Sequence, residues 1–290
     1  MTQSAPRRLV IFGASNIVSD LFDCALANGL LPAKVVLHLA ESDGPRDIPL
    51  AVRIEALRGL CDLPQVATLD DFQPGPDEVY LLGPTTPTRV NLAAEIERRF
   101  ALRYHTLVHP TAYVSPLARL GQGVFVGANS VIGPGVRLDD HVFVNRGVTI
   151  GHDTHIGSFS RIQPGANLGG LSRIGHGVTI AIGATLLERL EIGDGAFVGA
   201  GAVATADVPA GAASRLPAQP AEVASFASAA RPDSRWSCMR FCARAGSFRR
   251  RASRISRCSA SDCLRRPSSR NESRRVSLIT LRASSISCAR

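Results

Sequence analysis

Residues 111–206 repeat with a period of six, and this repeat restricts the possible fold more than any other feature of the sequence. Divided into hexads from Thr111, the segment has Val, Leu or Ile at the fourth position of fifteen consecutive hexads, from Val114 to Val198. The fifth position is Gly in nine of those fifteen hexads. The second is Ala, Ser, Thr or Val in all sixteen except the hexad with Leu190. No insertion breaks the phase, so each hexad is one structural unit.

Such a repeat predicts a parallel β-helix in which each hexad forms one short strand and one corner. Three hexads make a triangular coil, with the fourth-position aliphatic and the small second-position residue pointing inward. We expect the fifth-position glycine to permit the backbone geometry of the corner. Known proteins with this repeat form a left-handed prism and usually trimerise. The resemblance therefore implies a left-handed β-helix and a homotrimer.

Residues 8–105 show a different pattern, in which short apolar strands alternate with helices. The apolar run of residues 8–12 ends in a glycine turn, and a helical pattern follows, with Asn16 as a possible N-cap and Gly29 as a C-cap. Further strands are expected at residues 34–39 and 78–83, and a further helix at residues 88–100. This order predicts a small Rossmann-like α/β domain with a parallel sheet and helices on its faces.

Charge separates the end of the chain from the rest. Residues 231–290 hold 16 Arg and 3 acidic residues, a net charge of +13, whereas the other 230 residues carry 17 basic and 21 acidic groups, a net charge of −4. We therefore predict three segments. Residues 1–107 form the Rossmann-like domain that binds the acceptor, residues 108–222 form the β-helix domain, and residues 223–290 form an Arg/Ser-rich tail.

The tail has three possible interpretations: a basic arm that binds nucleic acid, a natural disordered extension, or an out-of-frame translation of a GC-rich gene. Arg supplies 32 of the 33 basic residues, which favours the last. We expect the tail to be disordered or non-native, and we expect no nucleic-acid partner because the remainder of the chain is acidic. We also expect no membrane partner and a cytoplasmic location, because no apolar run approaches the roughly 18 residues of a membrane span.

His152 and Asp153 form the most informative polar pair in the repeat. They occupy the sixth position of one hexad and the first of the next, which places both at a corner outside the prism. A rigid corner suits a general base, which must be held near the proton that it removes. On the residues alone, His152 can be a general base, a surface histidine or a metal ligand. We expect His155, His141 and His176 to be surface residues.

Two further residues are candidates for the same site. Gly170 lies one coil of 18 residues after His152, and neighbouring strands are about 4.8 Å apart, so its N–H can face a developing oxyanion beside the imidazole. Asn145 takes a fifth position that is usually Gly. It is either a polar group of the site or a substitute for glycine in left-handed geometry.

Four features together resemble one family. They are the βαβ start and the sequences VHPTAYVSP (108–116), GHDTHIGSFSRIQPGANLGG (151–170) and RLPAQPAEV (215–223). The chain resembles the bacterial sugar acetyltransferases of the sialic acid O-acetyltransferase and UDP-amino-sugar N-acetyltransferase type. The resemblance implies that His152 is the base, that Asp153 orients it, and that acetyl-CoA lies in a groove between two subunits of a trimer. The implied acetyl-CoA contacts are Asn145, Arg161 and Gly170.

The sequence departs from the family pattern at two places. Arg161 stands where several members have a second histidine that contacts the acetyl donor. The first loop reads GASNIVSD, with Asn16 in place of a Gly and without the family's histidine. The second loop, GPTTPTR (83–89), resembles that of the family with one extra residue. The implied acceptor-binding residues are Gly13, Ser15, Asn16, Gly83 and Arg89.

We therefore predict an acetyl-CoA-dependent acetyltransferase that needs no metal. It is expected to act by direct transfer on an amino sugar, a nucleotide-activated sugar or a sialic acid, in surface-polysaccharide or glycan biosynthesis. One alternative is a non-catalytic trimeric scaffold or sugar-binding module. Another is a β-helical metalloenzyme of the carbonic anhydrase type, although the spacing of His152 and His155 does not resemble that family.

Overall fold

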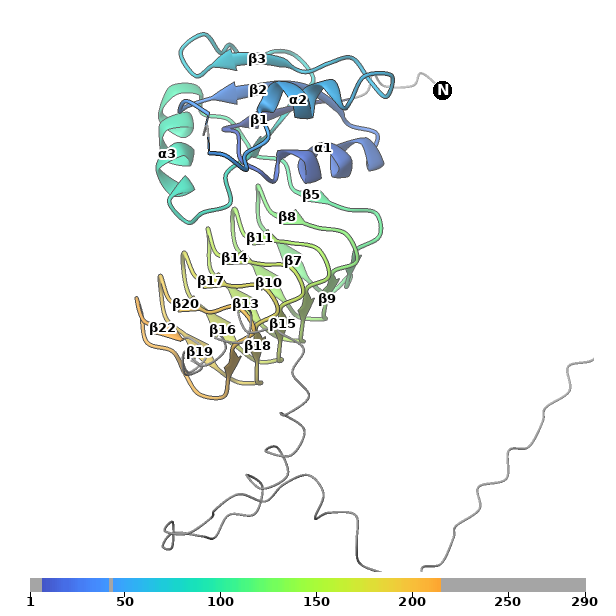
Figure 1. Ribbon diagram of the computed structural model, residues 1–290. Coiled ribbons are helices and arrows are strands. Elements are labelled where there is room, and N and C mark those ends of the chain that lie inside the picture. Colours follow the sequence, from blue (N-terminus) through green and yellow to red (C-terminus); the bar gives the residue numbers. More distant parts are fainter. Residues whose placement is uncertain (1–6, 42–43, 215–290) are drawn as a thin grey trace, which may run out of the picture. The chain divides into compact units, whose positions relative to one another are not determined.

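The computed structural model describes residues 7–41 and 44–214. The predicted tail, residues 223–290, lies outside them. The first part of the chain is a four-stranded parallel sheet in the order β3-β2-β1-β4 with helices packed against it (Figure 1). Its elements are β1 (Arg8–Phe12), α1 (Val18–Ala27), β2 (Leu31–Leu37), α2 (Leu50–Glu55), β3 (Gln65–Thr68), β4 (Glu78–Leu82) and α3 (Arg89–Phe100).

Alternation along β1 builds the core of this α/β part. Leu9 and Ile11 pack on the side that contains Leu21 of α1, and Val10 and Phe12 pack on the other side with residues of α3. The α/β prediction is confirmed, although β3 and α2 were not foreseen. Asn16 as N-cap is wrong, because Ile17 takes that position without a side-chain hydrogen bond.

The second part is a left-handed parallel β-helix, seen as stacked coils below the α/β part in Figure 1. Each strand is two residues long and pairs with a strand 18 residues away, as Thr149 does with Asn167, except that Phe197 pairs with Ala213, 16 residues later. One sheet holds β5 (Leu107–Val108), β8 (Phe125–Val126), β11 (Phe143–Val144), β14 (Arg161–Ile162), β17 (Thr179–Ile180), β20 (Phe197–Val198) and β22 (Ala213–Ser214). The next holds β6 (Tyr113–Val114), β9 (Val131–Ile132), β12 (Thr149–Ile150), β15 (Asn167–Leu168), β18 (Thr185–Leu186) and β21 (Val203–Ala204). The last holds β7 (Arg119–Leu120), β10 (Arg137–Leu138), β13 (His155–Ile156), β16 (Arg173–Ile174) and β19 (Glu191–Ile192).

The corners differ from the expectation in which hexad position takes the left-handed conformation. Left-handed φ values occur at the first position of every hexad from Gly123 to Gly201, and not at the fifth-position glycines. A fifth-position glycine is needed for space instead, since a Cβ on Gly151 would lie 2.5 Å from the Gly170 nitrogen of the next coil. Asn145, at a fifth position, is therefore no left-handed substitute for glycine.

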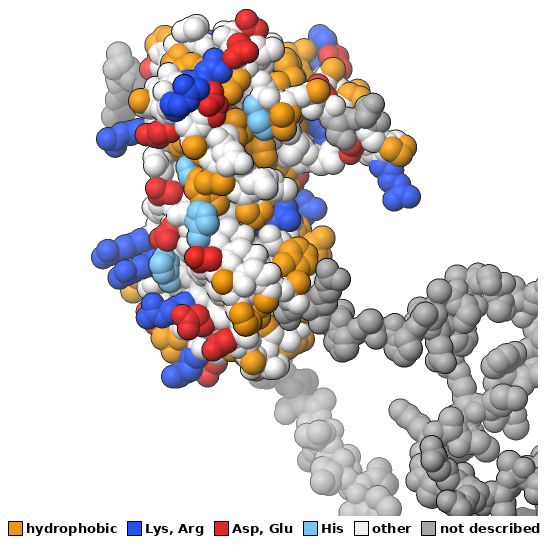
Figure 2. Space-filling view, turned by 90° about the vertical axis from the view of Figure 1, so that its left-hand side faces the viewer, with side chains coloured by type: hydrophobic (Ala, Val, Ile, Leu, Met, Phe, Trp, Pro, Cys, Tyr) orange, Lys and Arg blue, Asp and Glu red, His pale blue; other side chains and the backbone are white. Residues whose placement is uncertain are grey.

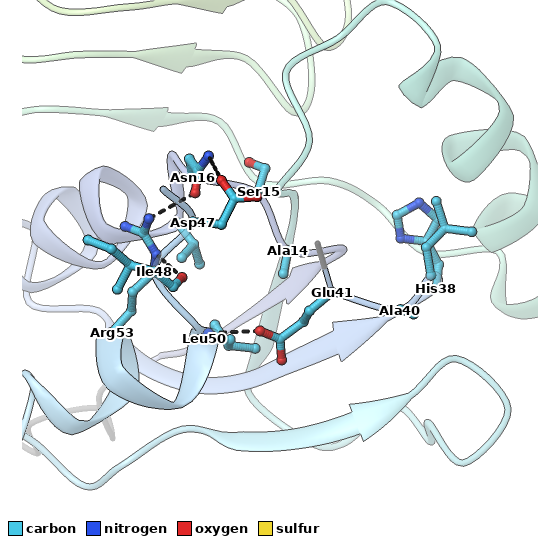
Figure 3. Close-up of a pocket in the computed structure, with 12 residues that line it drawn as sticks. Ala14, Ser15, Asn16, His38, Ala40, Glu41, Asp47, Ile48, Leu50 and Arg53 are labelled. Atoms are coloured by element: carbon cyan, nitrogen blue, oxygen red, sulfur yellow. Dashed lines mark hydrogen bonds between the residues drawn. The ribbon is translucent and has the colours of Figure 1, made fainter. Parts of the chain in front are cut away.

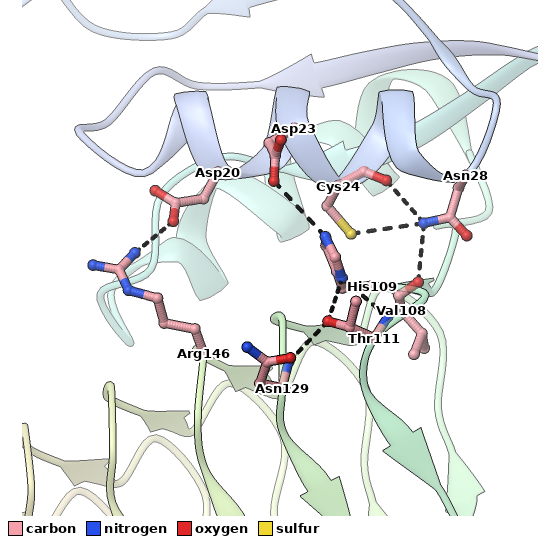
Figure 4. Close-up of polar contacts among 9 residues, drawn as sticks. All are labelled: Asp20, Asp23, Cys24, Asn28, Val108, His109, Thr111, Asn129 and Arg146. Atoms are coloured by element: carbon pink, nitrogen blue, oxygen red, sulfur yellow. Dashed lines mark hydrogen bonds and ion pairs between the residues drawn. The ribbon is translucent and has the colours of Figure 1, made fainter.

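Polar contacts join α1 to the first coils (Figure 4). Asp20 forms an ion pair of 2.7 Å with Arg146, and the Asn28 side chain donates to the carbonyl of Val108 at 3.0 Å. Phe143 belongs to the same apolar cluster as the α1 side chains. The α/β part and the coils belong to one compact unit. The predicted segment boundaries stay predictions. In the described part of the chain, no helix has the length and apolarity needed to cross a membrane.

Candidate active site

His152 and Asp153 lie at the corner between β12 and β13, as the repeat predicts. The His152 Nδ1 atom is 2.9 Å from an Asp153 carboxylate oxygen, and more than half of each side chain is exposed. Asp153 has a left-handed φ of 55° as the first residue of its hexad. A carboxylate that accepts the Nδ1 proton leaves Nε2 of the neutral ring as a hydrogen-bond acceptor. This arrangement suits a general base.

Gly170 lies directly against the other side of the imidazole. A Cβ at position 170 would be 2.9 Å from His152 Nε2 and 3.0 Å from the His152 carbonyl oxygen. The Leu171 N–H donates to that carbonyl at 2.8 Å, whereas no hydrogen bond of the Gly170 N–H occurs among the described residues. Gly170 therefore has no side chain that would displace the imidazole, and its N–H has no partner among the described residues.

Asn145 and Arg161 lie elsewhere on the prism. Asn145 is at the corner between β11 and β12, where it is 6% exposed and accepts a hydrogen bond of 2.8 Å from the Arg146 N–H. Arg161 lies on β14, and its Nε donates to the Thr179 hydroxyl at 3.0 Å. Burial lowers the pKa of Arg161. Within one chain, the structure does not bring either residue to His152.

Three of the five predicted acceptor residues meet where β1 and β4 end. Gly13 has a φ of 80°, and the Ser15 hydroxyl donates to the Gly83 carbonyl at 2.9 Å. A Cβ on Gly83 would lie 1.9 Å from the Gly13 carbonyl oxygen, so position 83 accepts only glycine. The carboxyl ends of parallel strands are a usual place for ligand binding in such folds.

A cavity of about 340 Å³ opens beside these loops, at the carboxyl ends of β1 and β2 (Figure 3). Ser15 and Asn16 line it. The Asn16 amide donates to Asp47 at 3.1 Å and accepts from Arg53 at 2.9 Å. Four further polar residues that were not predicted from the sequence line this cavity: His38, Glu41, Asp47 and Arg53. The sequence signal that could have identified these cavity residues is the presence of polar residues directly after an apolar strand, as in HLAES (38–42).

Arg89 is placed apart from this cavity. Its side chain is 4% exposed and donates to the backbone carbonyls of Thr85, Thr86, His141 and Ser160. Burial, together with the charge of Arg161, lowers the pKa of Arg89 to about 9. Arg89 thus fastens the start of α3 onto the coils.

Three other histidines of the coils, His141, His155 and His176, differ in their burial. His141 was expected at the surface and is instead buried, because Tyr104 and Phe159 pack against its ring at centroid distances of 4.5 and 4.8 Å. His155 is partly exposed, and its Nε2 is 2.9 Å from Asp139. His176 is exposed, as expected. Within residues 7–41 and 44–214, no three His, Cys, Asp or Glu side chains are grouped to hold a metal ion.

Comparisons with known proteins agree with this architecture. Residues 117–152 match the family described as bacterial transferase hexapeptide (six repeats). Among solved structures, the acetyltransferase domain of PglB from Neisseria gonorrhoeae is 28% identical with a TM-score of 0.60, covering 71% of this chain and 95% of that chain. Residues 117–152 thus share the hexapeptide repeat of bacterial transferases, and the chain is an acyltransferase. The same domain in complex with acetyl coenzyme A covers 72% of this acyltransferase and 96% of that chain, at 28% identity and a TM-score of 0.60.

A further solved structure shares the fold of this acyltransferase. It is a mutant of perosamine N-acetyltransferase from Caulobacter crescentus in complex with CoA and GDP-perosamine, with 22% identity and a TM-score of 0.60. It covers 74% of this chain and 97% of that chain. At this identity the likeness shows the fold alone. A search of the curated proteins finds no match.

Proposed function

We propose that this acyltransferase transfers an acetyl group from acetyl-CoA to an amino sugar, a nucleotide-activated sugar or a sialic acid. The observation that carries the proposal is the His152–Asp153 pair with Gly170 against its free nitrogen. PglB, whose acetyltransferase domain has been solved with acetyl coenzyme A, supports acetyl-CoA as the donor. The GDP-perosamine complex supports a nucleotide-activated sugar as one acceptor class. Such acceptors belong to surface-polysaccharide or glycan biosynthesis.

The reaction follows from the positions of these groups. The acceptor amine or hydroxyl attacks the thioester carbonyl, and His152 Nε2 takes the proton that it loses. Asp153 stabilises the resulting imidazolium, and the Gly170 N–H stabilises the oxyanion of the tetrahedral intermediate. The C–S bond then breaks, CoA leaves as a thiolate, and the imidazolium returns the proton to it. Residues 111–206 contain no cysteine, so no acyl-cysteine step is expected in the coils.

We also propose a homotrimer, because the single chain leaves the site incomplete. The sheet of β6 to β21 has no charged residue at its outward third positions, and Tyr113, Val131 and Val203 remain 58%, 42% and 58% exposed there. A neighbouring copy against this sheet can bring its own Asn145 or Arg161 to His152. The outward residues are Tyr113, Val131, Thr149, Asn167, Thr185 and Val203.

The acceptor is proposed to enter through the cavity of the α/β part. The residues that line the cavity all lie between Ala14 and Arg53, so the coils contribute nothing to it. An acceptor held there by its nucleotide must extend its sugar towards His152 of the same or a neighbouring subunit. Gly13, Ser15, Asn16 and Gly83 are proposed to hold it. Arg89 is proposed to act only indirectly, through the position of α3.

The experiment is thiol release from acetyl-CoA by the full chain, with a panel of UDP-amino sugars, GDP-amino sugars and sialic acids. We expect release that depends on one acceptor class. Binding of acetyl-CoA by calorimetry is measured in parallel. Absence of both binding and release would contradict the proposal and favour a non-catalytic trimeric scaffold.

A further inference from the structure

The outward face of the sheet β7-β10-β13-β16-β19 carries a row of basic side chains. Its third-position residues stand in register from coil to coil, in the order Arg119, Arg137, His155, Arg173 and Glu191. Adjacent strands of a sheet lie about 4.8 Å apart, so these side chains are neighbours. Figure 2 shows basic side chains along one edge of the coils, with acidic side chains and histidines beside them.

The three arginines of this row have no protein partner among the residues that the structure describes. Arg119, Arg137 and Arg173 are exposed and take part in no ion pair or side-chain hydrogen bond there. Arg146, on another corner, pairs with Asp20. Arg119 and Arg137 stand on neighbouring strands, where like charges repel, and a bound anion would offset this repulsion.

A hollow of about 340 Å³ lies between two of these arginines. Arg137 and Arg173 line it from two coils apart, with His155 between them and Asp153 at its edge. Asp153 is the carboxylate that holds His152, so the hollow adjoins the proposed base. Arg119 does not line this hollow.

The carboxylates near the hollow already have partners. Asp153 accepts from His152 at 2.9 Å, and Asp139 pairs with His155 at 2.9 Å. Arg137 and Arg173 thus line the hollow without an ion-pair partner of their own among the described residues, and Glu191 stands next to Arg173 in the row. The strands of Arg137 and Arg173 are separated by twice the spacing of neighbouring strands, about 10 Å, which two extended guanidinium groups can span onto one diphosphate.

We propose that Arg137 and Arg173 form a site for a phosphate or diphosphate group beside the acyl-transfer centre. The proposal rests on the proposed function for the source of that group. Both substrates of the transfer can supply it. CoA carries a diphosphate and a 3′-phosphate, and a nucleotide-activated sugar carries a diphosphate. The site would position one of these substrates relative to His152 without taking part in the chemistry.

The direct test is the binding of inorganic pyrophosphate to the full chain by calorimetry. Arg137→Gln and Arg173→Gln should each weaken binding about tenfold, because each removes a charge-assisted hydrogen bond. Arg119→Gln is the matched control, since it belongs to the same row outside the hollow, and it should change the Kd by less than twofold. Absence of pyrophosphate binding, or equal losses in all three variants, would overturn the proposal.

Two pairs of ligands show which substrate supplies the phosphate. The binding of CoA is compared with that of pantetheine, and the binding of UDP with that of uridine. If the donor occupies the site, Arg137→Gln and Arg173→Gln weaken CoA binding about tenfold and leave pantetheine binding unchanged. If the acceptor occupies it, UDP binding weakens and uridine binding does not. Unchanged binding of both CoA and UDP in both variants would overturn the proposal.

Failure of this site is distinguishable from failure of the proposed function. Pyrophosphate binding needs no turnover, so it should persist in His152→Ala. An anion site that depends on Arg137 and Arg173, in a chain that releases no thiol with any acceptor, would refute the acetyltransferase and retain the site. Acceptor-dependent thiol release with unaltered pyrophosphate, CoA and UDP binding in the arginine variants would refute the site alone.

Discussion

His152 and Asp153 are consecutive residues, yet their side chains meet at 2.9 Å because the corner turns between them. The left-handed φ of Asp153 belongs to the first position of the hexad and not to the pair itself. The repeat therefore supplies the conformation, and the sequence needs only to place a carboxylate there. At the residue scale, the candidate site is a local variation of an otherwise regular corner.

Gly170→Ala tests the space beside the imidazole. Its Cβ would lie 2.9 Å from His152 Nε2, so the ring or the backbone must shift, and we expect kcat to fall at least about tenfold. Gly195→Ala is the control: it has a φ of 65° and open space around its Cβ, so it should cost about 1 kcal/mol of stability and leave kcat unchanged. Equal kcat in Gly170→Ala and the wild type would argue against Gly170 in the site. Steady-state kinetics and urea unfolding measure the two effects.

At the scale of the elements, His141 shows how the α/β part is fixed to the coils. It is buried between Tyr104 and Phe159, and its carbonyl accepts a hydrogen bond from Arg89. Burial, with the nearby charge of Arg89, lowers the pKa of His141 to about 4, and Asp140 opposes this. A histidine held neutral in this way makes the contact sensitive to acid.

The pH dependence of stability follows from this pKa. Between about pH 4 and the ordinary value of 6.5, the unfolded chain binds a proton that the folded chain does not. The contribution of His141 to the free energy of unfolding is therefore fully present above pH 6.5. It decreases as the pH falls, by about 2 kcal/mol between pH 7 and pH 5. His141→Phe should remove this part of the dependence in urea unfolding, whereas His176→Phe, at an exposed corner, should keep it. An unchanged pH profile in His141→Phe would contradict the assignment.

The repeat made the β-helix predictable from sequence, because a period held over sixteen hexads admits one arrangement of strands. The corner was misassigned because two demands coincide in these hexads: the first position needs a left-handed φ, and the fifth needs a missing Cβ. Glycine satisfies both, so composition alone does not separate them. The structure separates them through Asp153, which has the left-handed φ and a side chain.

Contacts between the two parts of the chain were not predictable in the same way. His141 looks like any outward corner residue of the repeat, and it is buried because Tyr104 and Phe159 pack against its ring. Arg89 was assigned to the acceptor from a loop motif, and the structure shows its buried side chain in contact with the coils. A sequence period or a loop motif predicts the structure of one element. The burial of His141 and the position of Arg89 depend instead on contacts between two elements.

In the whole molecule, the proposed transfer site needs residues from more than one chain. His152 and Asn145 lie at different corners of the prism, on either side of the uncharged sheet that contains β9 and β12. Contact between copies through this sheet would bring the two residues together. The same contact would cover the exposed side chains of Val131 and Val203.

Val131→Asp tests this contact. A buried, unpaired carboxylate on each subunit should dissociate the trimer into monomers and abolish thiol release. Val66→Asp is the matched control, because Val66 is 50% exposed on β3 of the α/β part. Val66→Asp should have the same molecular mass as the wild type, measured by light scattering after gel filtration. A trimer that persists in Val131→Asp, or a monomeric wild type, would contradict this interface.

His152 is proposed to be the general base of an acetyl transfer. The most direct measurement is kcat for thiol release from acetyl-CoA with the responsive acceptor, compared among wild type, His152→Ala and His176→Ala. His176 is also the sixth residue of its hexad and exposed at a corner, but it lies on another edge. We expect kcat to fall about 10²–10⁴-fold in His152→Ala and less than twofold in His176→Ala. Wild-type kcat in His152→Ala, or equal losses in both variants, would contradict this role of His152.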